Sequence, residues 1–171
     1  MDNLVTVHFW RLNSLKVRLL LSTLVMTVIL LPIIGFTLTN AFERQLNLAT
    51  KNELKAYSYS IFTVAEVESN KLVMPELLLE TQFNVSQSGL YALITPLLKG
   101  NKISTPLWQS KSLLTLLLPI LLPSPEIGET IFSKINLAGN SHLLYSFSVS
   151  FSDNGQAFPV TLHLIKDQQQ F

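Results

Sequence analysis

The most prominent hydropathy pattern in the chain is a long uncharged run near its N-terminus. Between Arg18 and Glu43 there is no charged residue, and most residues from Leu19 to Phe42 are apolar. Because a helix rises about 1.5 Å per residue, about 20 apolar residues cross a hydrocarbon core of about 30 Å. The pattern therefore predicts a transmembrane helix over Leu19–Phe42, in which Pro32 is tolerated as prolines are in other membrane helices.

A cleaved secretory signal peptide is the competing interpretation of this run. Signal peptides have an apolar core of about 7–15 residues followed by a cleavage site of small residues. The segment Thr39–Ala41 has the character of such a site. The apolar run is longer than a signal core, however, and the helical pattern continues past Ala41. These two features favour an uncleaved membrane anchor.

The charges that flank the predicted span indicate its orientation. The segment before the span is basic and contains Arg11, Lys16 and Arg18, with Asp2 as its single acid. The segment after the span mixes both signs. Because Lys and Arg are enriched on the cytoplasmic side of a membrane, we expect residues 1–18 to form a cytoplasmic tail. Residues 43–171 would then form a periplasmic domain held at the bacterial inner membrane.

Apolar periodicity predicts that the helix continues beyond the membrane. From Ala41 to about Val67, apolar residues recur every three to five positions, at Phe42, Leu46, Ala49, Leu54, Tyr57, Ile61 and Ala65. This spacing is typical of an amphipathic helix, and neither Gly nor Pro interrupts it. We therefore expect one long rod that emerges from the membrane into the outer domain.

The next part of the chain alternates turn residues with short apolar segments. Glu68–Lys71 has turn composition and precedes a short predicted strand at Leu72–Met74. The segment Leu77–Phe83 fits either a helix or a loop. Leu90–Thr95 is rich in aliphatic and aromatic residues, which predicts a buried strand.

A second strand is expected to return beside this one. Lys99–Lys102 has the composition of a turn, and Ile103–Trp108 follows as a strand. Pro106 has no N–H to donate to a sheet, so this strand is expected at an edge. The apolar run Leu113–Pro123 comes next and is too short for a second crossing. It would either cap the core or contact the membrane surface or a second subunit, because so dense an apolar patch is a liability when exposed.

The C-terminal part of the chain predicts three consecutive strands. They cover Glu129–Leu137, His142–Phe151 and Phe158–Lys166, and a turn at Ala138–Asn140 separates the first two. The Asp-Asn-Gly sequence within Ser152–Gly155 is a hairpin signal. In the last strand Val160, Leu162 and Leu164 share one face. A long helix followed by such a meander predicts an α+β fold with the helix packed on an antiparallel sheet.

Composition narrows the classes of function that the chain can support. The net charge is +1, so there is no electrostatic footprint for nucleic acid. There are no cysteines, which excludes disulfides and thiolate metal sites. The sequence also contains no phosphate-binding loop, dinucleotide fingerprint or nucleophile elbow. We therefore expect no catalytic, cofactor-binding or metal-binding residue in this chain.

The few candidate site residues all have simpler structural explanations. His142 and His163 lie in neighbouring predicted strands and would make a metal pair only with a third ligand, so partly buried strand histidines are the simpler interpretation. Glu66 and Glu68 are two residues apart and would not share a helix face, which favours a solvated helix end over acid–base chemistry. Asp153 is expected to be a turn residue. Asn84 begins a glycosylation sequon, which has no meaning in a bacterial protein.

Several short motifs resemble a known family of signalling proteins. Ser14–Leu21 reads SLKVRLLL and leads into the predicted span, and the likeness continues through Glu68–Leu72, Gly100–Ile103 and Leu107–Ser110. In these segments and in its layout, the chain resembles the N-terminal sensing portion of PhoQ-like two-component sensor histidine kinases of Gram-negative bacteria. The resemblance covers most of the chain.

The resemblance implies a specific architecture and activity. Such kinases are dimers with two membrane helices around a periplasmic PAS-like sensor domain, followed by a HAMP relay and a kinase core. The core uses ATP and Mg to phosphorylate a histidine and passes the phosphoryl group to a response regulator. This chain shows no second span, phospho-accepting helix or nucleotide lid, so it is expected to be a sensing fragment. Ile135–Ser148 contains no acidic residue, so the divalent-cation sensing of the family is not expected here.

Two alternatives remain from the sequence. The chain would also fit a complete single-pass envelope or assembly protein that acts through protein contacts alone. With cleavage after Ala41, it would instead be a secreted binding protein. In the kinase interpretation the partners are membrane lipid, a second copy of the chain and, through the kinase core, a response regulator.

Overall fold

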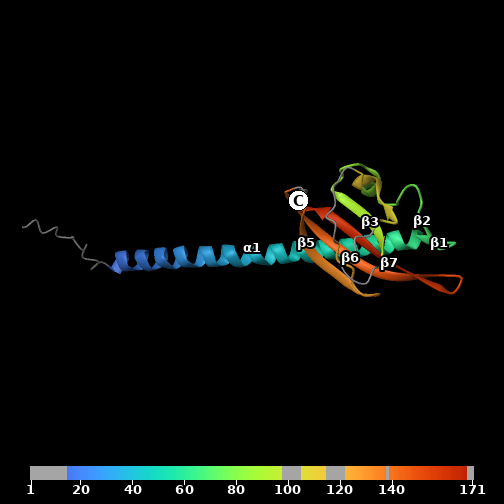
Figure 1. Cartoon of the computed structure of the whole chain (residues 1–171). Coiled ribbons are helices and arrows are strands. Elements are labelled where there is room, and N and C mark those ends of the chain that lie inside the picture. The colour runs from blue at the N-terminus through green and yellow to red at the C-terminus, as the bar shows by residue number, and fades with distance from the viewer. Residues whose placement is uncertain (1–14, 98–104, 115–121, 138, 169–171) are drawn as a thin grey trace, which may run out of the picture. The chain divides into compact units, whose positions relative to one another are not determined.

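The computed structural model describes most of the chain (Figure 1). The described residues are 15–97, 105–114, 122–137 and 139–168. The chain divides into two compact units, Met1–Leu48 and Ala49–Phe171, and the boundary falls inside one helix. Each unit is considered by itself below.

The helix α1 covers Leu15–Val64 and contains Pro32. Its most apolar 18-residue window has a mean hydropathy of 2.5, and none of that window is buried. By length and composition the helix can cross a membrane, and a signal sequence near the N-terminus has the same features. Hydroxyl groups in this part bond back to the helix, for example Thr27 Oγ1 to the Thr23 carbonyl at 2.9 Å. Such bonds shield the hydroxyls from an apolar surrounding.

The second unit is built on a five-stranded antiparallel sheet with the strand order β4-β3-β7-β6-β5. The strands are β3 (Leu90–Pro96), β4 (Trp108–Gln109), β5 (Thr130–Leu137), β6 (Asn140–Asp153) and β7 (Gln156–Asp167). The predicted meander is confirmed, because β5, β6 and β7 pair in sequence order. The sheet then continues through β3, which pairs with β7 along its whole length. The α+β class is therefore confirmed.

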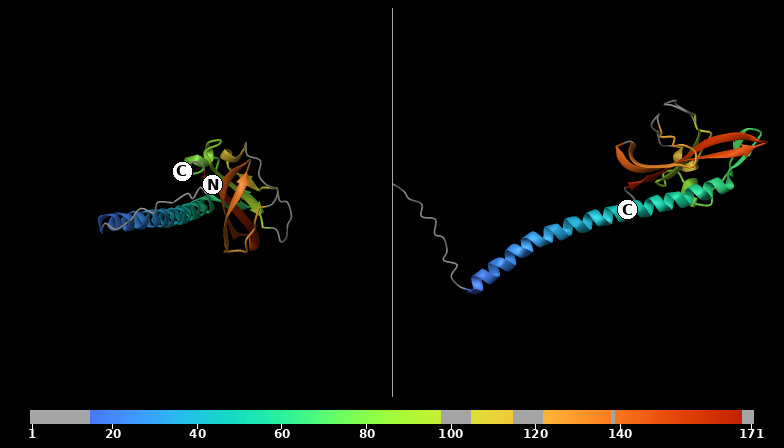
Figure 2. Two further views of the ribbon diagram at one scale, coloured as in Figure 1. Left: turned by 90° about the vertical axis from the view of Figure 1, so that its left-hand side faces the viewer. Right: turned by 90° about the horizontal axis from the view of Figure 1, so that it is seen from below.

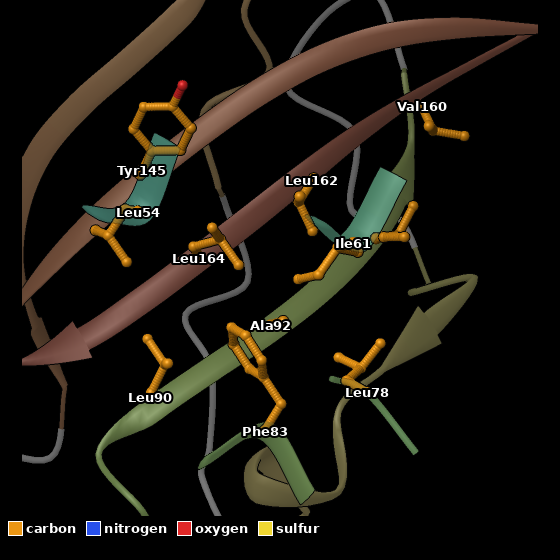
Figure 3. Packing of buried hydrophobic residues seen from close by; sticks show 11 residues of the cluster. Leu54, Ile61, Leu78, Phe83, Leu90, Ala92, Tyr145, Val160, Leu162 and Leu164 are labelled. Atoms are coloured by element: carbon orange, nitrogen blue, oxygen red, sulfur yellow. The ribbon is translucent and has the colours of Figure 1, made fainter. Parts of the chain in front are cut away.

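The C-terminal part of α1 packs on one face of this sheet, as Figures 2 and 3 show. Leu54 is fully buried and Ile61 is 2 % exposed, and both contact residues of β7 in the main hydrophobic core. Val160, Leu162 and Leu164 share this face of β7, as their alternation predicted. Burying one such side chain contributes about 1.5–3 kcal/mol, so Leu54 and Ile61 both stabilise the packing of the helix on the sheet.

A polar contact also joins the helix to the sheet. Glu53 on α1 accepts a hydrogen bond from Lys166 Nζ on β7 at 2.6 Å and from the Tyr57 hydroxyl at 3.1 Å. Burial, together with the charge of Glu53, raises the pKa of Tyr57 to about 12. The rings of Tyr57 and Phe83 make a T-shaped contact with their centroids 5.8 Å apart. The Lys166 bond therefore ties α1 to β7, while the Tyr57 bond, which lies within the helix, holds the Glu53 carboxylate in place.

The helix ends earlier than the sequence predicted. Residues 66–68 form β1 (Glu66–Glu68), which pairs with β2 (Lys71–Val73), so the expectation of helix to Val67 is wrong. Ser69 and Asn70 both have positive φ, at 50° and 60°. This is the geometry of a tight two-residue hairpin turn. Residues 66–68 form a strand rather than a further turn of helix because their backbone pairs with that of β2.

The strand expected over Ile103–Trp108 is shorter than predicted. In its described part only Trp108 and Gln109 pair, opposite Ile94 and Leu93, and residues 105–107 are not strand. Pro106 accounts for this, because it cannot donate to a ladder. The edge position is confirmed, while the turn Lys99–Lys102 lies outside the described residues. The ambiguous Leu77–Phe83 segment is a loop that enters η1 (Thr81–Asn84), a 3-10 helix.

A second core lies on the opposite face of the sheet. Tyr91, Leu93, Leu144 and Ile165 form it together with Leu113 and Leu137. Leu113 belongs to η2 (Lys111–Leu113), and Leu122 packs against the same cluster. The described ends of the apolar run Leu113–Pro123 therefore contact the core, while residues 115–121 lie outside the described residues.

Candidate functional site: a buried histidine and a tryptophan-lined pocket

The sheet face opposite α1 carries a cluster of buried hydroxyl groups around one histidine. His163 on β7 is fully buried. Its Nε2 lies 3.0 Å from Thr95 Oγ1 on β3, and its Nδ1 lies 2.9 Å from Ser146 Oγ on β6. Beside this triad, Ser148 Oγ and Thr161 Oγ1 are 2.8 Å apart. Residues of three strands thus form two neighbouring groups of buried polar contacts.

The chemistry of this cluster is that of a satisfied internal network. A neutral imidazole has one donor and one acceptor nitrogen, and each finds a hydroxyl here. Burial lowers the pKa of His163 to about 4, so the ring is neutral at neutral pH. The Ser146–His163 contact has the distance of a nucleophile and its base. Both side chains are fully buried, however, so a substrate cannot reach the pair, and its role is structural.

The structure does not bring His142 and His163 together. In the β6–β7 register His142 lies opposite Asp167, whereas His163 lies opposite Ser146. Four residues along a strand span about 13 Å, which is too far for one metal ion to bridge. His142 Nδ1 instead lies 3.0 Å from the Asn140 carbonyl oxygen. Among the described residues no group of three metal-ligating side chains is found.

The predicted acidic candidates belong to hairpins. Glu66 and Glu68 are exposed and lie on the same side of β1, so their expected place at a helix end is wrong. Asp153 lies at the end of β6, beside the hairpin turn, as expected, and has a further role. Its Oδ2 accepts a hydrogen bond from the Asn70 N–H at 2.9 Å, which ties the β1–β2 hairpin to the β6–β7 hairpin. Within the part of the chain that the structure describes, none of these carboxylates contacts a second group suited to acid–base chemistry.

Asn84 is a structural residue that closes the loop before β3. Its side-chain oxygen accepts the Leu78 N–H at 2.9 Å, and its Nδ2 donates to the Leu78 carbonyl at 2.8 Å. This two-point contact imitates a strand pair and satisfies both backbone groups of Leu78. Glu80 caps η1 by accepting the Gln82 N–H. The loop is thereby fixed over the Phe83 ring, which is 1 % exposed.

This loop forms one wall of a pocket that sequence reasoning did not single out. The pocket, named here the Trp108 pocket, has a volume of about 240 Å³. It is lined by Met74, Pro75, Glu76, Leu78, Phe83, Asn84, Trp108, Gln109, Ser110 and Lys111. These residues come from the segment after β2, from η1 and from β4 with the start of η2. Only the folded topology brings these segments together, so no local motif could have revealed the pocket.

Hydrogen bonds to β3 position the wall that carries Trp108. The Ser110 N–H donates to the Ala92 carbonyl at 2.8 Å, and the Ala92 N–H donates to Ser110 Oγ at 3.0 Å. Lys111 Nζ then lies 3.2 Å from Glu76 Oε1 on the facing wall. The side chains of Lys111 and Glu76 are 46 % and 88 % exposed, so the pair stands on the solvent side of the pocket. The Trp108 pocket can therefore offer both charges to a small ligand.

No family model, no curated protein and no solved structure matches this chain. A functional conclusion consequently rests on the residues and geometry of the chain itself. The relevant features are an apolar helix long enough to span a membrane, an α+β unit at its C-terminal end, and the Trp108 pocket in that unit.

Proposed function

We propose that this chain is the membrane-anchored sensing portion of a two-component sensor histidine kinase of the PhoQ-like kind. The observation that carries the proposal is the continuity of α1. One helix contains the apolar segment and also Leu54 and Ile61, which are buried in the core of the second unit. A helix of this kind couples a membrane span to a folded domain without an intervening flexible linker.

The proposal assigns a PAS-like sensor fold to the second unit. A five-stranded antiparallel sheet covered on one face by a helix is compatible with that fold. A stimulus bound in the periplasm would favour one of two packed states of a dimer by its differential free energy of binding. In the complete protein a second span and a kinase core with ATP and Mg would follow, and a response regulator would receive the phosphoryl group.

Site-directed labelling tests the proposed membrane topology. The chain has no cysteine, so a single introduced thiol reports one position. In intact spheroplasts a membrane-impermeant maleimide is expected to label Gln156→Cys, at an exposed position on β7, and to leave Asn3→Cys unlabelled until the membrane is permeabilised. Labelling of Asn3→Cys in intact spheroplasts would contradict a cytoplasmic N-terminus. A mature chain that begins near Phe42 would contradict the anchor.

Insertions at the boundary between the units, close to Lys51, test the coupling. Seven residues make about two helical turns, so seven alanines between Leu48 and Ala49 preserve both the helix and its phase. Seven glycines at the same place break the helix, because each glycine costs about 1 kcal/mol relative to alanine. We expect the glycine insertion to abolish the dependence of reporter output on envelope conditions, and the alanine insertion to retain it.

The measurement uses the complete kinase, or a chimera that joins residues 1–171 to the second span and kinase core of a PhoQ-like kinase. Transcription from a response-regulator promoter is recorded across pH, osmolarity and ionic strength. Equal responses from the two insertions would overturn coupling through α1. The envelope-protein alternative predicts a different result in the gene itself, namely a stop codon after Phe171 with stable expression of the short chain and no kinase frame downstream.

A further inference from the structure

The size of the Trp108 pocket limits what it can hold. Its volume of about 240 Å³ is below the range of roughly 300–1,000 Å³ that is typical of pockets for drug-sized ligands. One water occupies about 30 Å³ in the liquid, so a volume of about 240 Å³ corresponds to about eight waters. An amino acid with a medium-sized side chain is of this size.

The charges at the pocket are suited to a zwitterion. Lys111 Nζ and Glu76 Oε1 face each other from opposite walls at 3.2 Å. An exposed pair of this kind contributes little to folding stability, so separating it costs little. A ligand that carries a carboxylate and an ammonium group on one carbon atom would replace this one ion pair with two, one to Lys111 and one to Glu76. A ligand with only one charge would leave the other residue unpaired.

The remaining lining supplies apolar contact and one polar group of Trp108. Met74, Leu78, Phe83 and Trp108 provide aliphatic and aromatic surface. Among the described residues, no hydrogen-bond partner is found for Trp108 Nε1. Binding pockets typically combine such an apolar surface with a few polar groups that orient the ligand.

The walls of the pocket are held in place before any ligand binds. The Asn84–Leu78 contact fixes one wall, and the Ser110–Ala92 contact fixes the other to the central part of β3. Ser110 Oγ is further held by Ser112 Oγ at 2.8 Å. Rigid walls reduce the entropy lost on binding, so even a small ligand can bind with useful affinity.

From these observations we propose that the Trp108 pocket binds a free aliphatic amino acid. Its carboxylate contacts Lys111, its ammonium group contacts Glu76, and its side chain lies against Trp108. The binding itself is a property of this chain alone. The further statement that the amino acid is the stimulus of a sensor rests on the proposed function.

Tryptophan fluorescence of the full chain in detergent micelles tests the binding. The chain has two tryptophans, so Trp10→Phe leaves Trp108 as the single reporter. We expect L-leucine to change the Trp108 emission saturably, and isothermal titration calorimetry on the same sample to give the same dissociation constant. The probes 3-methylbutylamine and 4-methylpentanoate each lack one of the two charges of leucine, and are expected to bind at least tenfold more weakly because each loses a charge-assisted contact.

Paired variants localise the site. Glu76→Gln and Lys111→Gln are each expected to weaken leucine binding at least tenfold. Glu126→Gln and Lys134→Gln remove matched exposed charges outside the pocket and are expected to leave binding unchanged. Lys134 lies on β5, at the opposite edge of the sheet from β4. All four changes affect exposed side chains, so they should not disturb folding.

Two results would overturn the proposal. One is the absence of a saturable response to L-leucine, and the other is equal binding of leucine by the pocket variants and by the matched controls. The outcome is separable from that of the proposed function. Leucine binding without signalling in the chimera would support the amino-acid site and overturn the sensor role. Signalling without leucine binding would support the sensor role and overturn the amino-acid site.

Discussion

Replacing Leu54 with alanine is expected to lower the free energy of unfolding of the second unit by about 2–5 kcal/mol. Leu54 is fully buried where α1 meets the sheet. The substitution removes apolar contacts and leaves a cavity in a region where helix and strands cannot close around it freely. Because a domain is stabilised by only about 5–15 kcal/mol in total, this single change would remove a large part of its stability.

Urea denaturation of the full chain in micelles measures this effect, with Trp108 as the reporter in the Trp10→Phe background. Leu48→Ala is the matched control, since it makes the same change in the same helix at a position that is 56 % exposed. Its effect on the midpoint should be small. Equal shifts from Leu54→Ala and Leu48→Ala would show that the helix does not contribute Leu54 to the core.

Acid is expected to destabilise the second unit through His163. The pKa of this histidine is about 4 in the folded protein and 6.5 without the burial. Between these two pH values the unfolded chain binds more protons than the folded chain, so stability falls as the pH falls. The contribution is complete above pH 6.5. At 1.36 kcal/mol per unit, about 3 kcal/mol is lost by the time the pH reaches about 4.

The loss follows from the surroundings of the ring. Protonation makes both ring nitrogens donors, and Thr95 and Ser146 can accept from them, but these contacts do not replace the hydration of a buried cation. Carboxyl groups of the chain also change protonation in acid. The informative quantity is therefore the difference in unfolding free energy between the parent chain and a variant that lacks His163.

Urea denaturation at a series of pH values from 4 to 7.5 gives that difference. His163→Gln retains hydrogen-bonding capacity and does not titrate, so its stability should fall less steeply with acid than that of the parent chain. His142→Gln retains His163 and should keep the parent's steep dependence. If the His163→Gln profile parallels that of the parent throughout, His163 does not control the acid response.

Sequence patterns located most of the secondary structure, for identifiable reasons. β5, β6 and β7 are long and bounded by turns with glycine or asparagine, so alternation and turn composition sufficed. The Asn154–Gly155 turn has the positive φ values that its residues favour, 49° and 80°. The helix end was misjudged because Glu66–Glu68 is compatible with either state locally. Its strand pairing with Lys71–Val73 decided the outcome.

The two candidate sites lay beyond sequence reasoning. Of the two partners of His163, Ser146 lies on the neighbouring strand of the β6–β7 hairpin, whereas Thr95 is far away in the chain and becomes a neighbour only because β3 pairs with β7. Hydroxyl residues in strands are common and carry no signal by themselves. The Trp108 pocket likewise depends on the two hydrogen bonds between Asn84 and the backbone of Leu78. A side-chain contact to a backbone six residues away leaves no signal in the sequence.

The ion pair between Glu53 and Lys166 limits how the outer part of α1 can move along the sheet. A slide of the helix by one turn along the sheet would carry Glu53 about 5.4 Å away from Lys166, which it now contacts at 2.6 Å. It would also withdraw Leu54 and Ile61 from their places in the core. Helix and sheet consequently travel together as one block. Under the proposed sensing role, the signal would be a tilt or rotation of this helix and sheet together, not a sliding of the helix along its own sheet.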